Sequence, residues 1–310
     1  LDSIEFTTED SKEIKGIKNE EEYFEMQPRG RYILLDDIEI QSSIFGNANL
    51  PFDANLNGNG HSITKSSVQA FGSIGTKGVI ENIVYNYKFK NTTGVSYHYG
   101  IFTYNHGIVK NIQINLIEST RTPNSILAFM GHSNFGTIDH FIVNLQVPLY
   151  GSSSITAGLY RNYGTIQNGY LYGEQIRCDV TMINQSIGSA GIVLTNSGTV
   201  RNIYSLVTFS LSEENSNRNV GNIIYNNSSG SVAENLYSVG IGNGMLYTRG
   251  PTVYNNEGRL DKIYYFADEI FSNNDNQKMT MLALKDVSFQ NQVLNSQNAF
   301  LVEQLVSKNY

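Results

Sequence analysis

The chain has little cysteine, proline, tryptophan or charge. Among its 310 residues there are one cysteine, five prolines and no tryptophan. The lone Cys178 excludes an intrachain disulfide, and its surroundings (IRCDV) predict a buried strand thiol, because no nearby histidine would activate a nucleophile. Charged residues make up 16% of the chain, against ~25% in typical globular proteins. The formal net charge is -7 and no basic run occurs, which argues against a nucleic-acid partner.

Long apolar runs are also absent. No stretch of about 18 apolar residues occurs, so we expect no membrane span. The chain starts at Leu1 without a signal peptide, and we interpret it as a piece of a longer protein.

Glycine, in contrast, is frequent and regularly spaced. The pattern Gly-x-apolar-x-Asn-apolar recurs seven times, at intervals of 29, 29, 28, 34, 32 and 28 residues. A fixed period indicates one supersecondary unit stacked on itself. The copies begin at Gly78, Gly107, Gly136, Gly164, Gly198, Gly230 and Gly258.

Three further columns follow from aligning the copies. An apolar column consists of Ile80, Val109, Ile138, Ile166, Val200, Val232 and Leu260. One asparagine column precedes the glycines, at Asn105, Asn134, Asn162 and Asn196. A second follows them, at Asn82, Asn111, Asn168 and Asn202, with His140 and Lys262 as departures.

These columns predict an all-β fold. Six of the seven apolar positions are β-branched, and the apolar stretches are about 3 to 6 residues long, which favours strands over helices. We predict a single-stranded parallel β-helix of about eight coils, with glycine giving the tight corner its backbone freedom. Asparagines would bond to one another along the stack in buried corners. Alanine at Asn111 or Asn202 would then destabilise the fold more than loss of an exposed Glu81.

Both ends differ from the repeats. Residues 1–30 form a predicted N-terminal cap, in which 18–27 (KNEEEYFEMQ) indicate a short helix capped by Asn19. The predicted β-helix covers 31–266, and 31–40 (RYILLDDIEI) reads as one strand containing Asp36 and Asp37. Residues 267–310 lack glycine and form the predicted C-terminal cap over the open end of the stack.

Several segments resemble a known family. GLYRNYGTIQNGYLYG (158–173) and GIVLTNSGTVRNIYS (191–205) resemble the GLUG repeats of bacterial surface and secreted proteins. YILLDDIEI with FDANLNGNGHSIT, and LKDVSFQNQVLNSQNAFLVE near the end, resemble the GLUG-repeat region of Gram-positive secreted zinc metallopeptidases, the immunoglobulin A protease family.

The resemblance implies a secreted or cell-wall-attached, extracellular protein whose parent chain uses zinc. In that family, a His-Glu-x-x-His helix holds the zinc. None of the five histidines here, His61, His98, His106, His132 and His140, stands in such a motif. We therefore expect no catalytic residue, metal or cofactor in this chain. The resemblance implies a host protein or glycoprotein, such as immunoglobulin, as the partner, and we expect the chain to be a monomer.

A carbohydrate-active enzyme is an alternative, because parallel β-helices also host such enzymes. Glycoside hydrolysis needs two carboxyl groups about 5 to 10 Å apart. Glu81 and Asp139 occupy equivalent places two rungs apart, roughly 10 Å from the rung spacing, with Lys110 between them. No arginine- or lysine-supported acid cluster accompanies them.

Tyrosine is the most suggestive residue for binding. The 20 tyrosines crowd certain coils, and rows of them on a sheet face would suit sugars or proteins. An adhesin segment is thus a second alternative, and cross-rung bracing of the sheet is the plain structural one. The candidate binding residues are Tyr85, Tyr87, Tyr97, Tyr99, Tyr104, Tyr160, Tyr163, Tyr170 and Tyr172.

Overall fold

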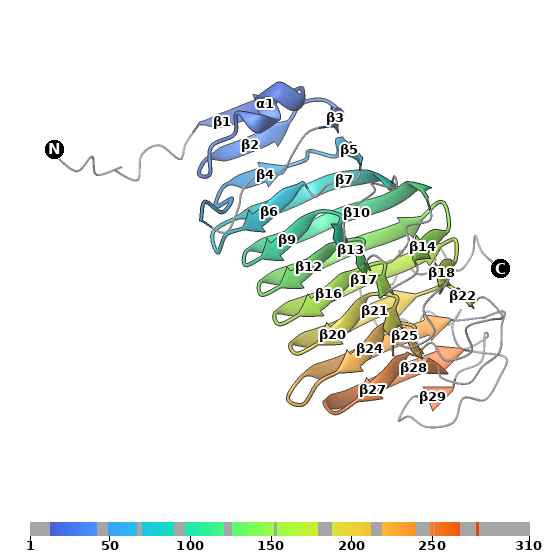
Figure 1. Ribbon diagram of the computed structural model, residues 1–310. Coiled ribbons are helices and arrows are strands. Elements are labelled where there is room, and N and C mark those ends of the chain that lie inside the picture. Colours follow the sequence, from blue (N-terminus) through green and yellow to red (C-terminus); the bar gives the residue numbers. More distant parts are fainter. Residues whose placement is uncertain are drawn as a thin grey trace, which may run out of the picture.

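The chain winds into a parallel β-solenoid, as predicted. The computed structural model describes residues 13–41, 49–66, 70–89, 97–120, 126–151, 154–178, 188–211, 219–239, 249–250, 252–266 and 277–278. Each strand pairs in parallel with its counterparts in the neighbouring turns, which gives a rod of stacked rungs (Figure 1). The sheet from β6 (Phe71–Ile74) to β27 (Val253–Asn256) has seven strands, one for each turn, and these mark about six complete turns, slightly fewer than the eight coils predicted.

Four sheets make up the described part of the rod. Sheet A runs β1 (Ile14–Ile17), β2 (Arg31–Leu34), β4 (Asn55–Asn57), β7 (Val79–Phe89), β10 (Ile108–Ser119), β13 (Thr137–Leu145), β17 (Thr165–Gly173), β21 (Thr199–Ser205), β25 (Val232–Val239), β28 (Arg259–Phe266) and β29 (Gln277–Lys278). Beside this path, β3 (Ile38–Ile40) pairs with β5 (Ser62–Ser66), which pairs with β7. Sheet B contains β6 (Phe71–Ile74), β9 (Phe102–Asn105), β12 (Gly131–Asn134), β16 (Leu159–Asn162), β20 (Val193–Asn196), β24 (Ile224–Asn227) and β27 (Val253–Asn256).

The two smaller sheets complete the turns. Sheet C contains β8 (Tyr97–Tyr99), β11 (Ile126–Ala128), β15 (Ile155–Thr156), β19 (Gly188–Ala190), β23 (Asn219–Gly221) and β26 (Arg249–Gly250). Sheet D contains β14 (Leu149–Gly151), β18 (Ile176–Cys178) and β22 (Phe209–Leu211). Cys178 is the last residue of strand β18, as its surroundings predict. Its side chain is not among those that the structure describes.

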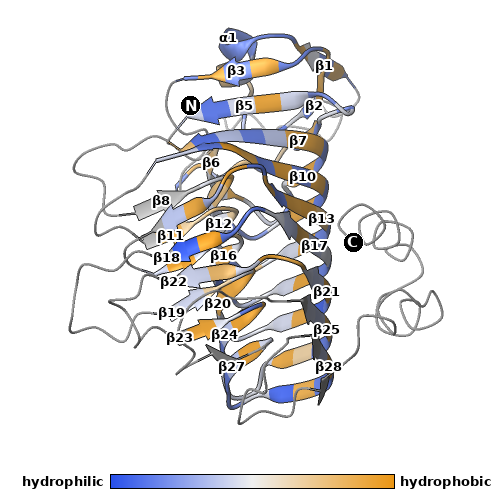
Figure 2. Ribbon diagram, turned by 90° about the vertical axis from the view of Figure 1, so that its right-hand side faces the viewer, coloured by the Kyte–Doolittle hydropathy of each residue, from blue (hydrophilic) through white to orange (hydrophobic). Residues whose placement is uncertain are grey.

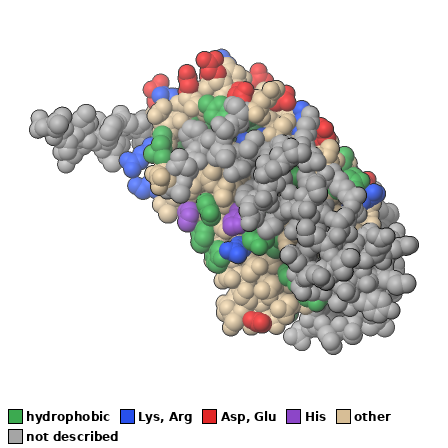
Figure 3. All heavy atoms as spheres, in the orientation of Figure 1, with side chains coloured by type: hydrophobic (Ala, Val, Ile, Leu, Met, Phe, Trp, Pro, Cys, Tyr) green, Lys and Arg blue, Asp and Glu red, His purple; other side chains and the backbone are tan. Residues whose placement is uncertain are grey.

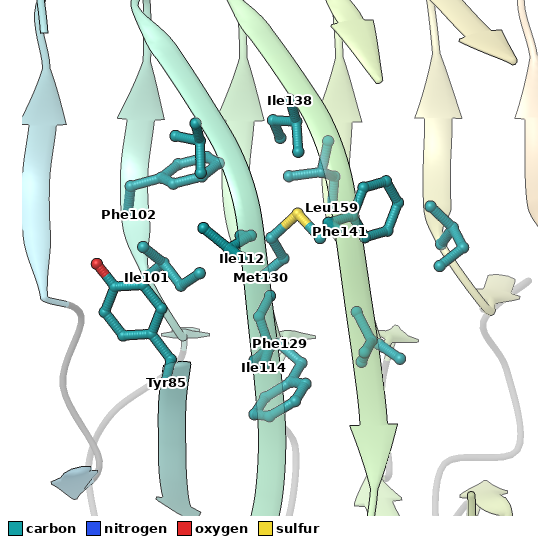
Figure 4. Packing of buried hydrophobic residues seen from close by; sticks show 14 of the residues in the cluster. Tyr85, Ile101, Phe102, Ile112, Ile114, Phe129, Met130, Ile138, Phe141 and Leu159 are labelled. Carbon is teal, nitrogen blue, oxygen red and sulfur yellow. The ribbon is translucent and has the colours of Figure 1, made fainter. Parts of the chain in front are cut away.

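The core fills the inside of the coil. Residues alternate between inward and outward along much of the long strands β7 and β13, and hydropathy alternates along the ribbon there (Figure 2). The apolar column lies fully inside at Ile80, Val109 and Ile138, and aromatic rings such as Phe102 and Phe129 fill the space between the sheets (Figure 4). One assignment was wrong, because Ala233, and not Val232, takes the core place beside Val200.

The corner glycines are required for space, which corrects the reason predicted for them. A Cβ on Gly107 would overlap the carbonyl oxygen of Gly78, and one on Gly136 would overlap that of Gly107. Gly164 and Gly198 are crowded in the same way. Of the seven repeat glycines, only Gly230 has a positive φ, of 81°.

Gly230 also lies outside the corner column. Val232 pairs with Thr199 and with Arg259, so Ser231 occupies the register of Gly198 and Gly258. The turn before it is two residues longer than its neighbour, and Gly230 adopts its left-handed bend within that turn.

The first asparagine column forms a continuous buried ladder. Asn105 Nδ2 donates to Asn134 Oδ1 over 2.7 Å, and the chain of bonds continues at 2.8 Å per step through Asn162, Asn196 and Asn227 to Asn256. The ladder residues Asn105, Asn134, Asn162, Asn196 and Asn227 are fully buried. This column is the buried one that the amide-ladder prediction requires.

The second asparagine column lies nearer the surface, so its predicted burial was wrong. Asn111 is exposed, and Asn82 and Asn202 are half-buried, although Asn168 is buried. All of them, with His140, Asn235 and Lys262, have φ between 51° and 55°. This column supplies the left-handed bend of each turn, a conformation that asparagine accepts more readily than most residues.

The N-terminal part contains the predicted short helix, over fewer residues than the predicted 18–27, and an unpredicted strand, β1, that joins sheet A. Helix α1 (Glu20–Phe24) begins at Asn19, whose side chain accepts a hydrogen bond of 2.9 Å from Glu22 N, as a cap does. The predicted strand 31–40 is split into β2 and β3, with Asp36 and Asp37 between them. The C-terminal cap lies outside the described residues apart from β29, and the domain boundaries stay predictions. Within the described ranges, no helix has the length and apolar character needed to cross a membrane.

Candidate functional site

The nine predicted tyrosines do not form one face. Tyr85, Tyr87 and Tyr170 are buried, with 3%, 4% and 3% of their surface exposed. Tyr85 and Tyr87 belong to the core inside the rod, whereas Tyr170 does not. The side chains of Tyr97 and Tyr99 lie outside the description. Tyr104 and Tyr163 are exposed, and Tyr160 and Tyr172 are half-buried.

Three exposed rings stack on one another at a corner of the coil. The residue between the ladder asparagine and the corner glycine is His106, Phe135 and Tyr163 in three successive turns. Their ring centroids are 4.7 and 4.8 Å apart and their planes differ by 3° and 8°. Since this spacing equals the distance between strands, the parallel register itself sets the stack. The same position is Ser197 in the next turn, so the stack ends at Tyr163.

A second aromatic row lies beside it, on the outer face of sheet B. Tyr104 meets the His132 ring edge to face at 5.9 Å, and His132 stacks on Tyr160 at 5.1 Å. The Arg161 guanidinium lies 5.2 Å from the centre of the Tyr160 ring. Partial burial, together with the Arg161 charge, lowers the pKa of His132.

Together the two rows form one surface, which we name the aromatic patch: Tyr104, His106, His132, Phe135, Tyr160 and Tyr163. Figure 3 shows hydrophobic and histidine side chains gathered beside a basic one where β9, β12 and β16 end. Among the described residues, seven large hydrophobic side chains are exposed, and four of them, Tyr104, Ile108, Phe135 and Tyr163, are in or next to this patch. Such a concentration marks a contact surface more often than scattered exposure does.

Three members of the patch, His106, His132 and Phe135, were not among the binding residues predicted from the sequence. A signal for two of them was present, because the Asn-x-Gly corner reads Asn-His-Gly, Asn-Phe-Gly and Asn-Tyr-Gly in consecutive repeats. Comparing that variable position across the columns identifies the corner row, whereas counting tyrosines does not.

Tyr172 belongs to a different feature. It lines an open groove of about 440 Å³ with Asn144, Gln146 and Glu174, at the ends of β13 and β17. Tyr170, two residues earlier on β17, is in register with the half-buried Ile142, whereas Leu171 takes the inward place beside Val143. Tyr170 stacks on Tyr204 at 5.2 Å, which is the structural bracing considered from the sequence. The groove is separated from the aromatic patch by the length of a strand of sheet A.

The two carboxylates weighed for glycoside hydrolysis are engaged with neighbours. Lys110 pairs in register with Glu81 on one side and Asp139 on the other, as predicted. Its ammonium lies 3.0 Å from Glu81, whose side chain is only 18% exposed. Asp139 lies 2.8 Å from His140 Nδ1 and accepts a 2.7 Å hydrogen bond from Asn168. These contacts make the column a charge-compensated surface.

Metal ligands are not grouped in the described ranges. Nowhere in this part of the chain do three His, Cys, Asp or Glu side chains come together in the way a metal ion requires. Zinc therefore has no candidate donor set among the described residues.

One lysine is buried in the first turns. Lys65 is 2% exposed, and desolvation lowers its pKa to about 7, with Glu20 acting in the opposite direction. Its side chain lines a void of about 10 Å³, beside Tyr85 and Phe129. This is a cost to stability at neutral pH, since burial penalises the charged form.

Comparison with known proteins gives the fold and little more. No protein-family model matches the sequence, and no curated protein matches it either. A solved structure, described as a "putative immunoglobulin A1 protease" from Bacteroides ovatus, is similar with a TM-score of 0.51 and 13% sequence identity. The similarity covers 89% of this chain and 86% of that one. At this identity the match supports a shared β-solenoid fold.

Proposed function

We propose that this chain is a non-catalytic β-solenoid module of a secreted or cell-surface bacterial zinc metalloendopeptidase, and that it contacts a host protein or glycoprotein through the aromatic patch. The patch is the observation that carries the proposal. Exposed tyrosine, phenylalanine and arginine are the residues that supply most binding energy at protein interfaces. The similar fold of the Bacteroides ovatus protein supports the choice of immunoglobulin A1 as the first partner to test.

The rod itself suits a positioning role. Sheet A continues from β7 to β28 and sheet B from β6 to β27 by parallel pairing in each turn, and a buried amide ladder links the turns from β9 to β27. A module built in this way holds a surface patch at a fixed distance from whatever is joined to its ends. Sequencing the gene on both sides of these 310 residues tests the peptidase part, since a reading frame without a His-Glu-x-x-His motif would refute it.

Binding is tested on the purified chain with immunoglobulin A1 as the probe. The double variant Phe135→Ser, Tyr163→Ser removes the stack with little expected damage, because Ser197 already occupies the equivalent corner. Tyr254→Ser is the matched control: Tyr254 is half-buried on sheet B and stacks on Tyr225 at 5.2 Å, away from the patch.

We expect saturable binding in biolayer interferometry, at least tenfold weaker in the double variant and unchanged in the control. Immunoglobulin G and serum albumin serve as comparison proteins. Equal binding by the wild type and the double variant would show that the patch is not the contact surface. No binding at micromolar concentration would exclude immunoglobulin A1 as the partner.

A second candidate function rests on the groove beside Tyr172. Its amide, carboxylate and phenol groups, from Asn144, Gln146, Glu174 and Tyr172, suit a small polar ligand such as an oligosaccharide. Titration with a glycan array distinguishes it, because glycan binding there would be lost in Tyr172→Ser and kept in the patch variant.

A further inference from the structure

The electrostatic character of the aromatic patch differs from that of the whole chain. The seven strands of sheet B contain no aspartate or glutamate, although the chain has a net charge of -7. Arg161 is exposed and forms no ion pair with any residue that the structure describes, and the exposed Lys77 stands at the corner one turn before His106. The patch therefore lies in a locally basic region.

The nearest carboxylates along this corner are already engaged or distant. Asp53 accepts the backbone N–H of Lys77 at 3.1 Å, in the preceding turn. Glu257 stands at the equivalent corner three turns beyond Tyr163, roughly 14 Å away from the strand spacing. Neither neutralises Arg161, so this charge is available to an external anion.

The rims of the rings are available as well. The Tyr163 hydroxyl and the His106 ring nitrogens have no hydrogen-bond partner within the described structure. The same holds for the Tyr104 hydroxyl. Phe135, with both faces covered by its neighbours, is still 45% exposed, so its exposed surface is its edge. Ring edges carry positive partial charge and favour contact with anions.

The faces of the rings, by contrast, are mostly occupied. His106 and Tyr163 each cover one face of Phe135, whereas a sugar that stacks on an aromatic platform needs an uncovered face. The end of the stack above Ser197 leaves one face of Tyr163 without a ring partner. This arrangement favours a polypeptide partner over a glycan, since a single side chain can extend the stack while carboxylates meet the edges.

We infer that the aromatic patch recognises an acidic segment of polypeptide, which places an aromatic or aliphatic side chain on Tyr163 above Ser197 and a carboxylate on Arg161. The inference rests on the proposed function only in taking the patch as a binding surface. Bidentate pairing with a carboxylate is a geometry that arginine provides and that lysine does not.

Selection from a random display library of 12-residue peptides on the immobilised chain tests this chemistry directly. We expect the enriched peptides to carry Asp or Glu beside Phe, Tyr or Leu, and to bind more weakly at 500 mM than at 50 mM salt. Synthetic copies should bind Arg161→Gln about tenfold more weakly, a loss of ~1.4 kcal/mol, and should also be weakened by Tyr163→Ser. Tyr254→Ser should leave their affinity unchanged.

The outcomes separate this inference from the proposed function. Enriched peptides that lose affinity in Tyr163→Ser but contain no excess of acid, or bind Arg161→Gln normally, would overturn the acidic-segment inference and leave the patch as a binding surface. Glycan-array binding that depends on Arg161, without peptide enrichment, would replace the polypeptide with an anionic glycan and overturn the inference. Absence of both kinds of binding at the patch would overturn the inference, and the proposed function would then be decided by the immunoglobulin A1 measurement alone.

Discussion

Replacing Asn162 by alanine tests the buried amide ladder most directly. Asn162 is fully buried, and its Nδ2 donates to Asn196 Oδ1 at 2.8 Å and to the carbonyl oxygens of Thr199 and Gly164 at 3.1 and 3.2 Å. Its Oδ1 accepts a 2.8 Å bond from Asn134. Alanine removes all four contacts.

The expected loss of stability is ~3 to 5 kcal/mol. Each buried hydrogen bond contributes about 1 kcal/mol net, and the cavity left by the amide adds to that sum. The groups left behind keep part of their bonding, since Asn134 Nδ2 still reaches the Gly136 carbonyl and Asn196 Oδ1 still accepts from Gly198 N. This residual bonding keeps the loss from being larger.

The outer asparagine column provides the controls. Asn111 is exposed, with φ of 51°, and donates to Asn82 Oδ1. Asn111→Ala should cost ~1 to 2 kcal/mol, mainly because alanine is strained in the left-handed conformation, whereas Asn111→Gly should stay within ~1 kcal/mol of the wild type.

Urea denaturation followed by circular dichroism, with far-UV spectra confirming the fold of each variant, measures the three changes on one scale. The buried ladder has no such role if Asn162→Ala is as stable as Asn111→Ala. Equal losses in Asn111→Ala and Asn111→Gly would show that backbone strain does not govern the outer column.

Three further perturbations test other parts of the fold. Lys65→Met removes an ammonium group whose pKa is about 7 in the folded chain and 10.5 in the unfolded chain. Between these pH values the unfolded chain binds the extra proton, so from pH 7 to 10.5 the free energy of unfolding of the wild type should rise by up to ~5 kcal/mol relative to that of the variant. The same pH dependence of stability in both proteins would contradict this. Gly136→Ala should destabilise by ~1 to 3 kcal/mol, because its Cβ meets the fixed backbone of Gly107, and an unchanged urea midpoint would refute the crowding. Phe135→Ser should cost under ~3 kcal/mol, the upper value of the two aromatic pairs that Phe135 forms, and a larger loss would show that the stack supports the fold.

The sequence was sufficient for the architecture because one signal is repeated in every turn. The period, the β-branched columns and the corner glycines all indicate the same repeating turn, so one misaligned copy does not change the predicted fold. The exception is the copy at Gly230, where a turn two residues longer shifts the alignment and places Val232 where Ala233 belongs.

Burial of the two asparagine columns could not be read from the sequence. Both have the same residue type at the same period, and they differ only in whether the backbone bends left-handed, as at Asn111, or stays extended with the amide inside, as at Asn134. Asn196 of the ladder and Asn202 of the outer column are only six residues apart in the chain. Periodicity alone therefore does not show which of the two side chains points into the core. The burial of the tyrosines could not be predicted either, since Tyr170 and Tyr172 are two residues apart on one strand and only Tyr170 is buried.

The corner position directly after the ladder asparagine shows which side chains the fold requires and which it tolerates. In six successive turns this position is His106, Phe135, Tyr163, Ser197, Ser228 and Glu257. The backbone of each turn continues in register whichever side chain is present, so the fold accepts small, charged or aromatic groups there alike. The fold therefore does not require the rings that occupy three consecutive turns, nor Tyr104, His132 and Tyr160 on the adjacent face. Under the proposed function, a partner that contacts about three rungs at once would account for both rows of rings.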